Sequence, residues 1–315
     1  MARFFPLPPG YRDGSVAVII PTRNGGRWLD AVLGMLQRQT LQVDEILLVD
    51  SGSTDATREI ARRYDTRLVQ IPAETFDHGG TRNFAAAMVT ADILIYMTQD
   101  AIPADEYALA RLVQPLLENG KIAASYGRQL ADPEADPFAE HLRLFNYPDK
   151  SSVRYWQDRH QCGFRTIFIS NSFAAYKKKI LQKCGSFPDR QIFGEDASAV
   201  AVMLERGYGV CYVSDACVYH SHNYSIWDEF QRYFDIGVFH SLRSDILAKF
   251  GTPQKTGNRF VRSECAFLCK QHKYHLLPLS LLRSVVKYVA YQLGKRYRIF
   301  PGWISKRLSM QKYWW

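Results

Sequence analysis

Several short polar segments of this chain hold side chains whose types and spacing could do chemistry. In YMTQDAIP (96–103) an apolar run stops abruptly, and a single carboxylate, Asp100, follows it. An acid at the end of a buried strand suits a hard divalent cation, which needs only one or two protein carboxylates when a diphosphate supplies other oxygens. A cap of the following helix is the weaker alternative, because Pro103 and Asp105 lie closer to that helix. The segment therefore predicts a metal role for Asp100.

Two further segments offer a pair of ligands and a base. In VYHSHNYS (218–225) His220 and His222 follow a strand pattern and, at this spacing, would face the same side, toward a phosphate or a metal. In FGEDASAV (193–200) the adjacent acids Glu195 and Asp196 stand at an expected helix start. Acids are common there because of the helix dipole, but one of them could instead be a general base that deprotonates an attacking hydroxyl.

Two glycine-containing segments suit a phosphorylated ligand. In VDSGSTD (49–55) a strand delivers Asp50, which could accept a hydrogen bond from a nucleobase or ribose, and Ser53 or Thr54 could cap a helix. In FDHGGTRN (76–83) the paired glycines predict a tight turn before a helix that begins near Thr81, with Arg82 at its start, where an anion is favoured. A plain strand–turn–helix junction and a surface arginine are the alternatives. The chain has no GxGxxG and no GxxxxGKS or GxxxxGKT segment, so dinucleotide and P-loop sites are not supported.

These segments lie at the ends of alternating strand and helix patterns. Apolar runs without alternation, separated by helical patterns, predict an α/β fold with a parallel sheet that is covered on both faces and binds ligands at the carboxyl ends of its strands. The expected strands are 15–22, 44–50, 67–71, 92–97, 121–128, 168–178 and 207–220, and the expected helices are 28–39, 53–64, 81–89, 106–119 and 198–207. Residues 130–165 are expected to form an irregular excursion over the site, and the chain after His222 to be helical.

The bulk composition is that of an ordinary globular protein of 315 residues, 47% hydrophobic and 23% charged. The net charge of +9 is concentrated, because residues 255–315 hold 13 Lys or Arg against one acid, Glu264, giving +12 and leaving −3 for the other 254 residues. The front of the protein therefore needs no polyanionic partner. Six scattered cysteines fit a reducing cytoplasm, and MARFFPLPPGYRDG lacks the apolar core of a signal peptide. We expect a cytoplasmic protein.

Residues 276–303 combine an apolar helical stripe with several cations. The stripe consists of Leu279, Leu282, Val286, Val289 and Leu293. Two central cations, Arg283 and Lys287, argue against a spanning helix, which needs about 20 mainly apolar residues. An interfacial helix on an anionic inner leaflet fits better, with Tyr313, Trp314 and Trp315 among the headgroups. The alternative is a helix packed on the rest of the chain or on a second subunit, with its basic face in solvent.

Taken together, VIIPTRN, VDSGSTD, the RN pair at 82–83, TQDA and GED, in this order and at these spacings, resemble the family-2 glycosyltransferases. These are inverting enzymes with a GT-A fold that use nucleotide-diphosphate sugars. The resemblance covers about residues 16–225 and implies a Rossmann-like α/β fold, with a mixed, mostly parallel sheet flanked by helices. It implies a catalytic domain over 1–225, with a nucleotide-sugar half at about 1–104 and an acceptor half at about 105–225. Residues 226–315 would then be a basic helical region that is membrane-peripheral or oligomerising.

The resemblance also implies roles for single residues. The implied donor contacts are Pro21, Thr22, Arg23, Asn24, Asp50, Ser53, Asp55, His78, Gly79, Arg82, Asn83 and Gln99. Asp100 would hold Mg²⁺ or Mn²⁺ together with His220 and His222, although Thr98 replaces the first acid of the family's DxD motif. Asp196 would be the base, with Glu195 as its orienting neighbour or as the alternative base. The residues that lie where acceptor contacts could fall are Trp156, Arg165, Asn171 and Ser172.

Within the family, FDHGGTRN, TQDA, FGED and HSHNYS look most like bacterial rhamnosyltransferases. Those enzymes transfer L-rhamnose from dTDP-β-L-rhamnose during the assembly of O-antigen, capsule or related wall glycans. The implied acceptor is a polyprenyl-diphosphate-linked glycan at the cytoplasmic face of the inner membrane. The alternatives are another nucleotide sugar on the same scaffold, a nucleic-acid-binding protein that uses the basic tail, and a noncatalytic scaffold. We expect no nucleic-acid partner, because the tail has few interleaved glycines or aromatic platforms.

Overall fold

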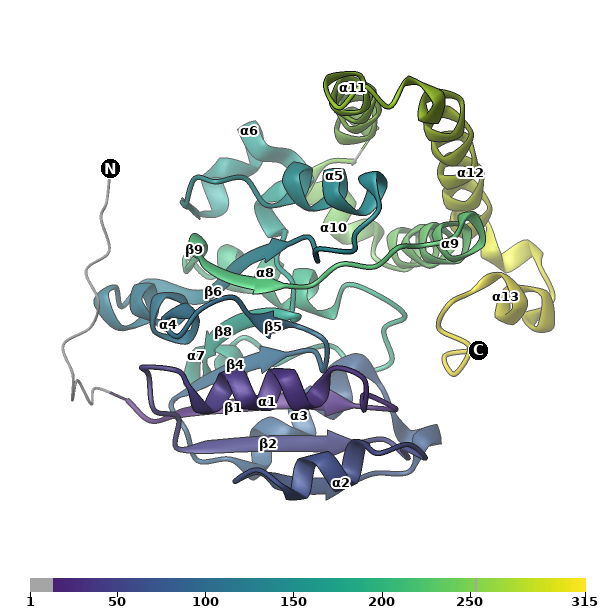
Figure 1. Ribbon diagram of the computed structural model, residues 1–315. Helices are drawn as coiled ribbons and strands as arrows, with labels where there is room; N and C mark the ends of the chain where they lie inside the picture. Colours follow the sequence, from purple (N-terminus) through teal and green to yellow (C-terminus); the bar gives the residue numbers. More distant parts are fainter. Residues whose placement is uncertain (1–13, 253) are drawn as a thin grey trace.

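The computed structural model describes residues 14–252 and 254–315. Its centre is one sheet of nine strands in this described part, with helices on both faces (Figure 1). The strands are β1 (Val16–Thr22), β2 (Glu45–Asp50), β3 (Arg67–Gln70), β4 (Ile93–Met97), β5 (Ile102–Pro103), β6 (Ile122–Leu130), β7 (Ser152–Arg154), β8 (Phe173–Lys177) and β9 (Gly209–Tyr219). They follow the order β3-β2-β1-β4-β8-β6-β9-β5, and β7 also pairs with β9.

Most of these strands run in the same direction. β3, β2, β1 and β4 pair in parallel. β8 is antiparallel to both β4 and β6, so β6 and its parallel neighbour β9 run with the first four strands. The expected mixed, mostly parallel sheet is therefore confirmed. The carboxyl ends of β1, β2, β4, β6 and β9 all open on one edge of the sheet, which is where such folds bind ligands.

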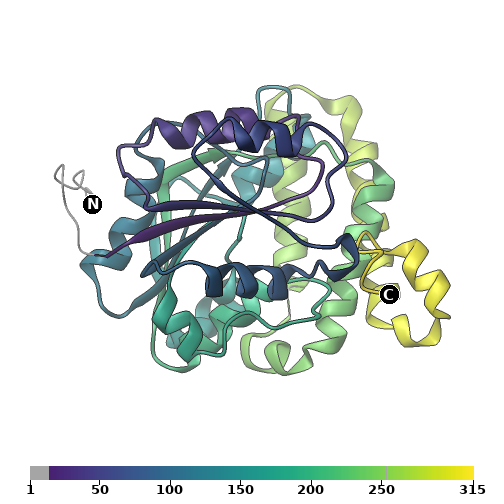
Figure 2. The same ribbon diagram turned by 90° about the horizontal axis from the view of Figure 1, so that it is seen from below.

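Two helical layers cover the sheet because both of its faces are apolar. In β1, Val18 and Ile20 belong to one buried cluster, whereas Ala17 and Ile19 belong to the other. The helices of this part are α1 (Leu29–Gln37), α2 (Thr57–Arg62), α3 (His78–Met88), α4 (Ala108–Glu118), α5 (Pro137–Asn146), α6 (Arg159–Cys162), α7 (Lys178–Lys183) and α8 (Glu195–Glu205). α1, α2 and α4 cover one face, and α3, α7 and α8 cover the other, as the view from below shows (Figure 2).

The C-terminal part is helical, as expected. It consists of α9 (Ile226–Leu242), α10 (Ser244–Phe250), α11 (Gln254–Lys270), α12 (Leu277–Lys295) and α13 (Gly302–Leu308). The backbones of α9 and α12 touch where Gly237 faces Gly294. A Cβ atom added to Gly294 would lie 2.0 Å from the carbonyl oxygen of Phe234, and one added to Gly237 would lie 2.3 Å from that of Tyr291. This close approach requires residues without a side chain.

α12 turns its central cations toward the protein. Arg283 and Lys287 each lie 2.9 Å from a carboxylate oxygen of Glu229 in α9, and all three side chains are nearly inaccessible to solvent. The solvated basic face of the alternative interpretation is wrong for these two cations, because Glu229 gives them a buried partner. The opposite face of α12 is apolar and outward, with five side chains between 44% and 59% exposed: Leu281, Leu282, Val285, Tyr288 and Val289. No helix in the ranges 14–252 and 254–315 combines the length and apolarity that crossing a bilayer requires.

The helix expected over 53–64 and the irregular excursion expected over 130–165 differ from the structure. The helix expected over 53–64 begins at Thr57, because Ser53 and Thr54 bond to the loop after β1 instead of capping a helix. The excursion expected over 130–165 contains α5, β7 and α6. α5 forms because Asp136 caps it, accepting a hydrogen bond from the N–H of Ala139, and Pro137 occupies the first helical position.

Candidate functional site

Asp100, His220 and His222 meet at the carboxyl edge of the sheet. Asp100 lies just past β4, and the two histidines follow β9. Nε2 of His220 lies 3.3 Å from Oδ1 of Asp100, and Nε2 of His222 lies 3.5 Å from Oδ2. Although burial opposes ionisation, the hydrogen bond and charge of His220 hold the pKa of Asp100 below its usual value. Burial, followed by the charge of His220, lowers the pKa of His222 to about 4. A carboxylate and a neutral imidazole are thus available together to one cation.

Gln129 orients His220 within this cluster. Its Oε1 lies 3.0 Å from Nδ1 of His220, and its Nε2 donates to Oγ of Ser170 at 3.0 Å. An imidazole that donates from Nδ1 to an amide oxygen leaves Nε2 free to bind a cation. Sequence reasoning missed Gln129, which lies inside β6 with no motif around it; only its place near the end of a strand beside β9 could have drawn attention to it.

The loops after β1 and β2 hold each other through side chains that the sequence singled out. The N–H of Asn24 donates to Oγ of Ser53 at 2.8 Å, and Oδ1 of Asn24 accepts from the N–H of Thr54 at 2.8 Å. Oδ2 of Asp55 accepts from the N–H of Gly26 at 2.9 Å. Asn24 has a left-handed backbone, with φ 49°, which asparagine tolerates better than most residues. These residues therefore fix the shape of the loop pair, and contact with a nucleotide remains a prediction for them.

Gln99 ties this loop pair to the strand that carries Asp100. Its side chain accepts from the N–H of Arg23 at 2.8 Å and donates to the carbonyl of the same residue at 3.0 Å. Pro21 and Thr22 end β1, and Thr22 lies opposite Asp50 in the parallel register.

Asp50 is fully buried at the end of β2. Its Oδ2 accepts from the N–H of Ser53 at 3.2 Å. Its Oδ1 has no hydrogen-bond partner among the residues that the structure describes. A buried carboxylate oxygen in this state is a place where a donor group of a ligand would be stabilised.

The FDHGGTRN segment is folded differently from the prediction. α3 begins at His78, because the carboxylate of Asp77 caps it by accepting from the N–H of Gly80 at 2.6 Å. Gly79 lies in the first turn, where a Cβ atom would be 2.1 Å from the carbonyl oxygen of Pro188. The expected tight turn that presents amide groups to a ligand is therefore wrong: the glycines serve a helix start and its close packing.

As a consequence, Arg82 and Asn83 lie in the second turn of α3 and face the protein. The side chain of Asn83 donates to the carbonyl of Phe187 at 2.8 Å and accepts from its N–H at 3.1 Å. Arg82 is buried and lies 3.0 Å from Oε1 of Glu195. The expected position of Arg82 at a helix start is wrong, and its first observed function is to pair with Glu195; a role toward the donor stays a prediction.

Glu195 and Asp196 open α8 and lie in contrasting environments. Glu195 also accepts from Nδ2 of Asn171 at 3.2 Å, and although burial opposes it, the charges of Arg82 and then His78 lower the pKa of Glu195. Asp196 accepts from the N–H of Asn171 at 3.3 Å, and burial followed by the charge of Glu195 raises its pKa to about 7. Two carboxyl groups whose pKa values are pushed apart in this way suit one permanent anion and one proton acceptor.

Residues at the far end of the chain reach the predicted donor contacts. Oε1 of Gln311 lies 3.3 Å from Nε2 of His78, and the ring of Tyr313 lies 4.7 Å from the guanidinium carbon of Arg23. The carboxylate of Asp235 in α9 holds this segment by accepting from the N–H of Gln311 at 3.2 Å. No spacing rule connects residues more than 200 positions apart, so the sequence could not reveal these contacts.

The terminal tryptophans pack on the protein. Nε1 of Trp314 donates to the carbonyl of Arg190 at 2.8 Å, and Trp315 lies against Phe234, with 6.2 Å between ring centres. The expectation that these two rings sit among lipid headgroups is therefore wrong, because the protein itself supplies their partners.

The residues suggested for the acceptor divide into two groups. Asn171 bonds to both Glu195 and Asp196, and the carbonyl of its neighbour Ser172 accepts from the N–H of Thr98. Trp156 packs against Phe250 instead, and Arg165 donates to the carbonyl of Asn146.

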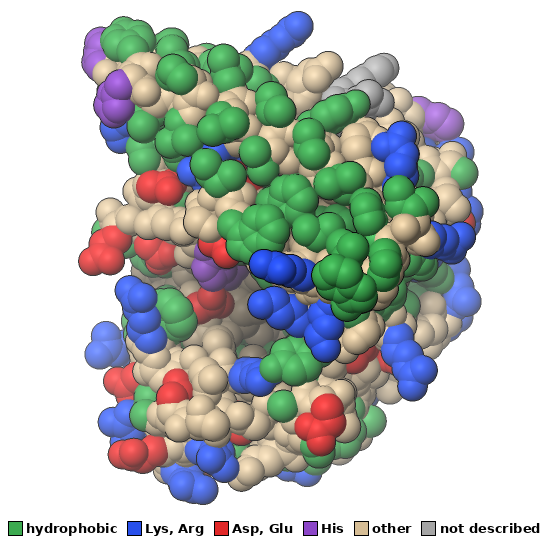
Figure 3. Space-filling view, turned by 90° about the vertical axis from the view of Figure 1, so that its right-hand side faces the viewer, with side chains coloured by type: hydrophobic (Ala, Val, Ile, Leu, Met, Phe, Trp, Pro, Cys, Tyr) green, Lys and Arg blue, Asp and Glu red, His purple; other side chains and the backbone are tan. Residues whose placement is uncertain are grey.

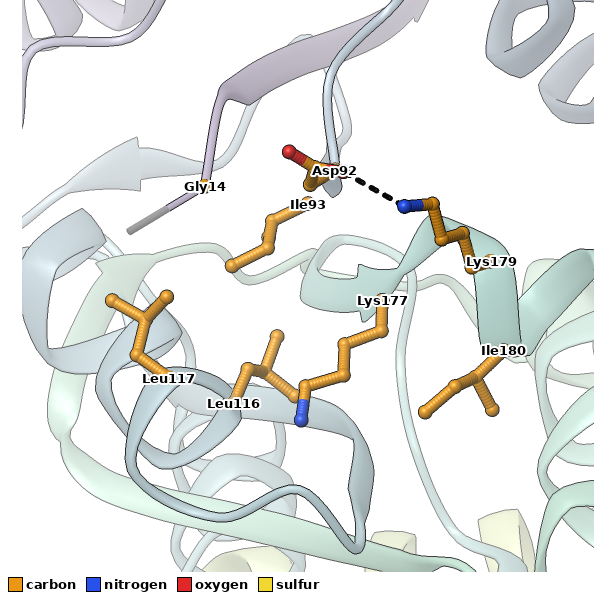
Figure 4. Close-up of a pocket in the computed structure, with 8 residues that line it drawn as sticks. All are labelled: Gly14, Asp92, Ile93, Leu116, Leu117, Lys177, Lys179 and Ile180. Carbon is orange, nitrogen blue, oxygen red and sulfur yellow. Dashed lines mark ion pairs between the residues drawn. The ribbon is translucent and has the colours of Figure 1, made fainter. Parts of the chain in front are cut away.

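Two of the cavities lie at opposite ends of the strands. The larger, about 450 Å³, is at the amino end of β4 and is lined by Gly14, Asp92, Ile93, Leu116, Leu117, Lys177, Lys179 and Ile180 (Figure 4). Because Asp92 precedes β4 and Asp100 follows it, this cavity lies at the wrong end of the strand for the chemistry described above. The smaller, about 270 Å³, is at the carboxyl end of β6 and β9, next to Gln129 and Tyr219.

The chain is similar in sequence to known proteins. The family model described as glycosyl transferase family 2 matches residues 17–185. The chain is 41% identical to the O-antigen chain rhamnosyltransferase RfbN of Salmonella typhimurium, over 95% of this chain and 96% of that protein. It is 40% identical to the O-antigen chain rhamnosyltransferase WbaN of Salmonella anatum, over 96% of each chain.

Solved structures share the fold at low sequence identity. A mannosyltransferase from Pyrobaculum calidifontis, in complex with GDP-Man and Mn²⁺, superposes with a TM-score of 0.59 at 21% identity, covering 97% of this chain and 86% of that one. Residues 1–349 of TarS from S. aureus, in complex with UDP, superpose with a TM-score of 0.55 at 15% identity, covering 90% and 91% of the two chains.

Proposed function

Because the chain belongs to glycosyl transferase family 2, we propose that it transfers L-rhamnose from dTDP-β-L-rhamnose to a hydroxyl of a lipid-linked glycan, as in O-antigen assembly. Two rhamnosyltransferases at about 40% identity over nearly the whole chain favour this sugar over another nucleotide sugar. Glycosyltransferase activity itself follows from the family, so the noncatalytic scaffold considered from the sequence loses its support.

The proposal depends mainly on one observation. Asp100, His220 and His222 lie together at the same edge of the sheet as Asp196. One ligand atom from each of the three lies within 4.8 Å of the others, which fits a single divalent cation. Two imidazole nitrogens and one carboxylate suit Mn²⁺ better than Mg²⁺, because Mg²⁺ prefers an all-oxygen shell. When bound, this cation would neutralise charge on the diphosphate of the donor.

The residues of the chain then divide the remaining work. The loops after β1 and β2, with the free oxygen of Asp50, hold the nucleoside half of the donor. Asp196 removes the proton of the attacking hydroxyl, which adds to the anomeric carbon as the bond to the diphosphate breaks. Glu195 remains an anion because Arg82 is paired with it, and its charge keeps Asp196 basic enough to accept that proton near pH 7. Inversion converts the β-linked donor into an α-L-rhamnoside.

A donor comparison tests this assignment. The protein is incubated with Mn²⁺, a lipid-linked glycan fraction and, in turn, dTDP-β-L-rhamnose, UDP-glucose or GDP-mannose, and release of the nucleoside diphosphate is measured. We expect turnover with dTDP-β-L-rhamnose and an α-linked product by NMR. The Asp196→Asn variant should lose about 10²–10⁴-fold in rate while binding dTDP as the wild type does. Faster turnover of another nucleotide sugar would replace rhamnose by that sugar.

We also propose that the outward face of α12 lies on an anionic membrane surface. Leu281, Leu282, Val285, Tyr288 and Val289 form this face, and Lys295, Arg296 and Arg298 follow it. Figure 3 shows hydrophobic side chains gathered over the C-terminal helices, with Lys and Arg beside them. An apolar strip next to cations matches the headgroup layer of an anionic bilayer, where a lipid-linked acceptor would be found.

Vesicle sedimentation tests the membrane proposal. The intact protein should sediment with vesicles that contain phosphatidylglycerol, and less with pure phosphatidylcholine. Val289→Asp should reduce this binding, whereas Val153→Asp, at a similarly exposed apolar position in β7 (45% against 44%), should not. The assignment to α12 would be contradicted if both variants lost the same amount of vesicle binding. It would also be contradicted if the protein bound equally to vesicles with and without phosphatidylglycerol.

A further inference from the structure

Three arginines near the metal-binding edge form no ion pair with a carboxylate of the residues that the structure describes. The side chains of Arg128 in β6 and Arg143 in α5 make no hydrogen bond or ion pair with any residue of 14–252 or 254–315, and Nε of Arg143 is fully buried. The guanidinium carbon of Arg232 in α9 lies 5.3 Å from the ring centre of Phe193 and 5.8 Å from that of Tyr224, and its charge reaches Asp235 without an ion pair. Guanidinium groups brought together without an acid repel one another, so their grouping favours the binding of an anion.

Arg128 and Arg143 line the cavity of about 270 Å³ at the carboxyl end of β6. A bulge in the pairing of β6 with β9, between Gly127 and Arg128, turns the strand here, as bulges beside functional sites commonly do. The rest of the lining is Gln129, Leu130, Ala131, Glu140, Leu144, Tyr147 and Tyr219. The one acid in this lining, Glu140, accepts from Nε2 of Gln271 at 3.3 Å.

The neighbouring carboxylate, Asp132, is also engaged. It accepts from the N–H of Ser221 at 2.9 Å and from its hydroxyl at 2.6 Å. Neither acid forms an ion pair or hydrogen bond with Arg128 or Arg143, although the charge of Asp132 reaches Arg143, and the two guanidinium groups keep their donors available for a ligand.

The cavity connects directly to the catalytic groups. Gln129 belongs to its lining and also bonds to His220 of the metal-binding cluster. Tyr147 belongs to its lining and lies close enough to Asp196 to feel its charge. The ring of Tyr224 lies 5.3 Å from the ring of His222, and the guanidinium group of Arg232 lies over the ring of Tyr224. A ligand group in the cavity would thus lie beside both the cation and the base.

We propose that Arg128 and Arg143 bind a phosphate group of the lipid-linked acceptor in this cavity. The proposal rests on the proposed function and adds a subsite for the acceptor. The donor loops follow β1 and β2, whereas the cavity lies across β4 and β8 from them, at β6 and β9. Guanidinium groups recognise phosphate oxygens through paired hydrogen bonds, so two of them can hold a diphosphate.

Calorimetric titration with farnesyl diphosphate tests the subsite without requiring turnover. The full-length protein is first saturated with dTDP and Mn²⁺, so that the donor's phosphate position is filled. We expect farnesyl diphosphate to bind and farnesol to bind much more weakly. Arg143→Ala and Arg128→Ala should each raise the Kd for farnesyl diphosphate about tenfold or more, and Arg143→Lys should restore part of the loss. The Kd for dTDP should not change.

Two results would overturn the subsite. An unchanged Kd for farnesyl diphosphate in both alanine variants would show that these arginines do not bind it. An equal rise in the Kd for dTDP would show that these arginines bind the phosphates of the donor and not those of the acceptor. Arg62→Ala, an exposed arginine in α2, is the matched control and should behave as the wild type. Because Arg128 and Arg143 lie in different elements, a folding defect in one variant leaves the other informative, and failure of rhamnose transfer would not affect this titration.

Discussion

Replacing Asp196 by Asn should inactivate the protein and stabilise it at the same time. The carboxyl group of Asp196 is largely removed from solvent and lies beside the anionic Glu195, so burial and this charge raise its pKa from 3.8 to about 7. The native state therefore holds the proton more tightly than the unfolded chain does. By linkage, deprotonation of Asp196 does not lower the free energy of unfolding below about pH 4. Between about pH 4 and pH 7 it lowers this free energy progressively, and above about pH 7 the loss is complete. Asparagine is neutral at every pH and carries no such loss.

The size of the effect follows from the pKa values. A difference of about 3 units corresponds to about 4 kcal/mol at 1.36 kcal/mol per unit. Asn cannot accept hydrogen bonds on both side-chain atoms, so the bond from the N–H of Asn171 is lost, at about 1 kcal/mol. The side chain also keeps some contact with solvent, which reduces the first figure. We expect Asp196→Asn to be more stable than wild type by about 2 kcal/mol at pH 8, and no more stable at pH 4.

Urea unfolding at several pH values between 4 and 8 measures this difference directly. The stability advantage of Asp196→Asn should grow with pH across this window and level off above about pH 7. Asp65→Asn, at an exposed position, should show no pH-dependent difference and serves as the control. A variant that is less stable than wild type at pH 8, or a difference that does not depend on pH, would refute the reasoning that Asp196 is a destabilised base.

Three further predictions concern the metal-binding cluster and two close contacts. EDTA should abolish transfer, and Asp100→Asn should raise the Mn²⁺ concentration for half-maximal rate about tenfold or more; a rate insensitive to EDTA would contradict this. Gly79→Ala should lower the melting temperature, because its Cβ would meet the backbone of Pro188 at 2.1 Å and overpacking costs about 1–3 kcal/mol, whereas Gly120→Ala, with open space around it, should not. Gly294→Ala should likewise lower the melting temperature, because it disrupts the contact of α9 with α12, and Gly302→Ala is its matched control. Equal melting temperatures within either pair of variants would show that the backbone shifts to accommodate the added Cβ atom.

The sequence predicts the sheet well, because its physical signal is local. β1, β2 and β4 are continuous apolar runs that can be buried only between two helical layers, and polar residues mark the end of each. The same reasoning correctly anticipates that Asp100, His220 and His222 share one edge, since strands that run together deliver their ends to the same place.

The sequence fails where a partner comes from a distant element. The two glycines of FDHGGTRN are ambiguous locally, and only the carbonyl of Pro188 explains why Gly79 must lack a side chain. Neither the interfacial helix nor its alternative with a solvated basic face gives Arg283 and Lys287 a protein partner, because Glu229, more than 50 residues away, is not visible in the pattern of their own helix. In each case tertiary contact decides what the local pattern leaves open.

The contact between Gln311 and His78 has a consequence for how the protein is made. A ribosome that has synthesised the whole sheet has already produced every motif by which the family is identified, yet the segment that touches His78 and Arg23 has still to emerge. A nascent chain can thus form its sheet before the contacts of Gln311 with His78 and of Tyr313 with Arg23 exist. The predicted donor contacts His78 and Arg23 would gain these partners only after residues 311–313 have emerged.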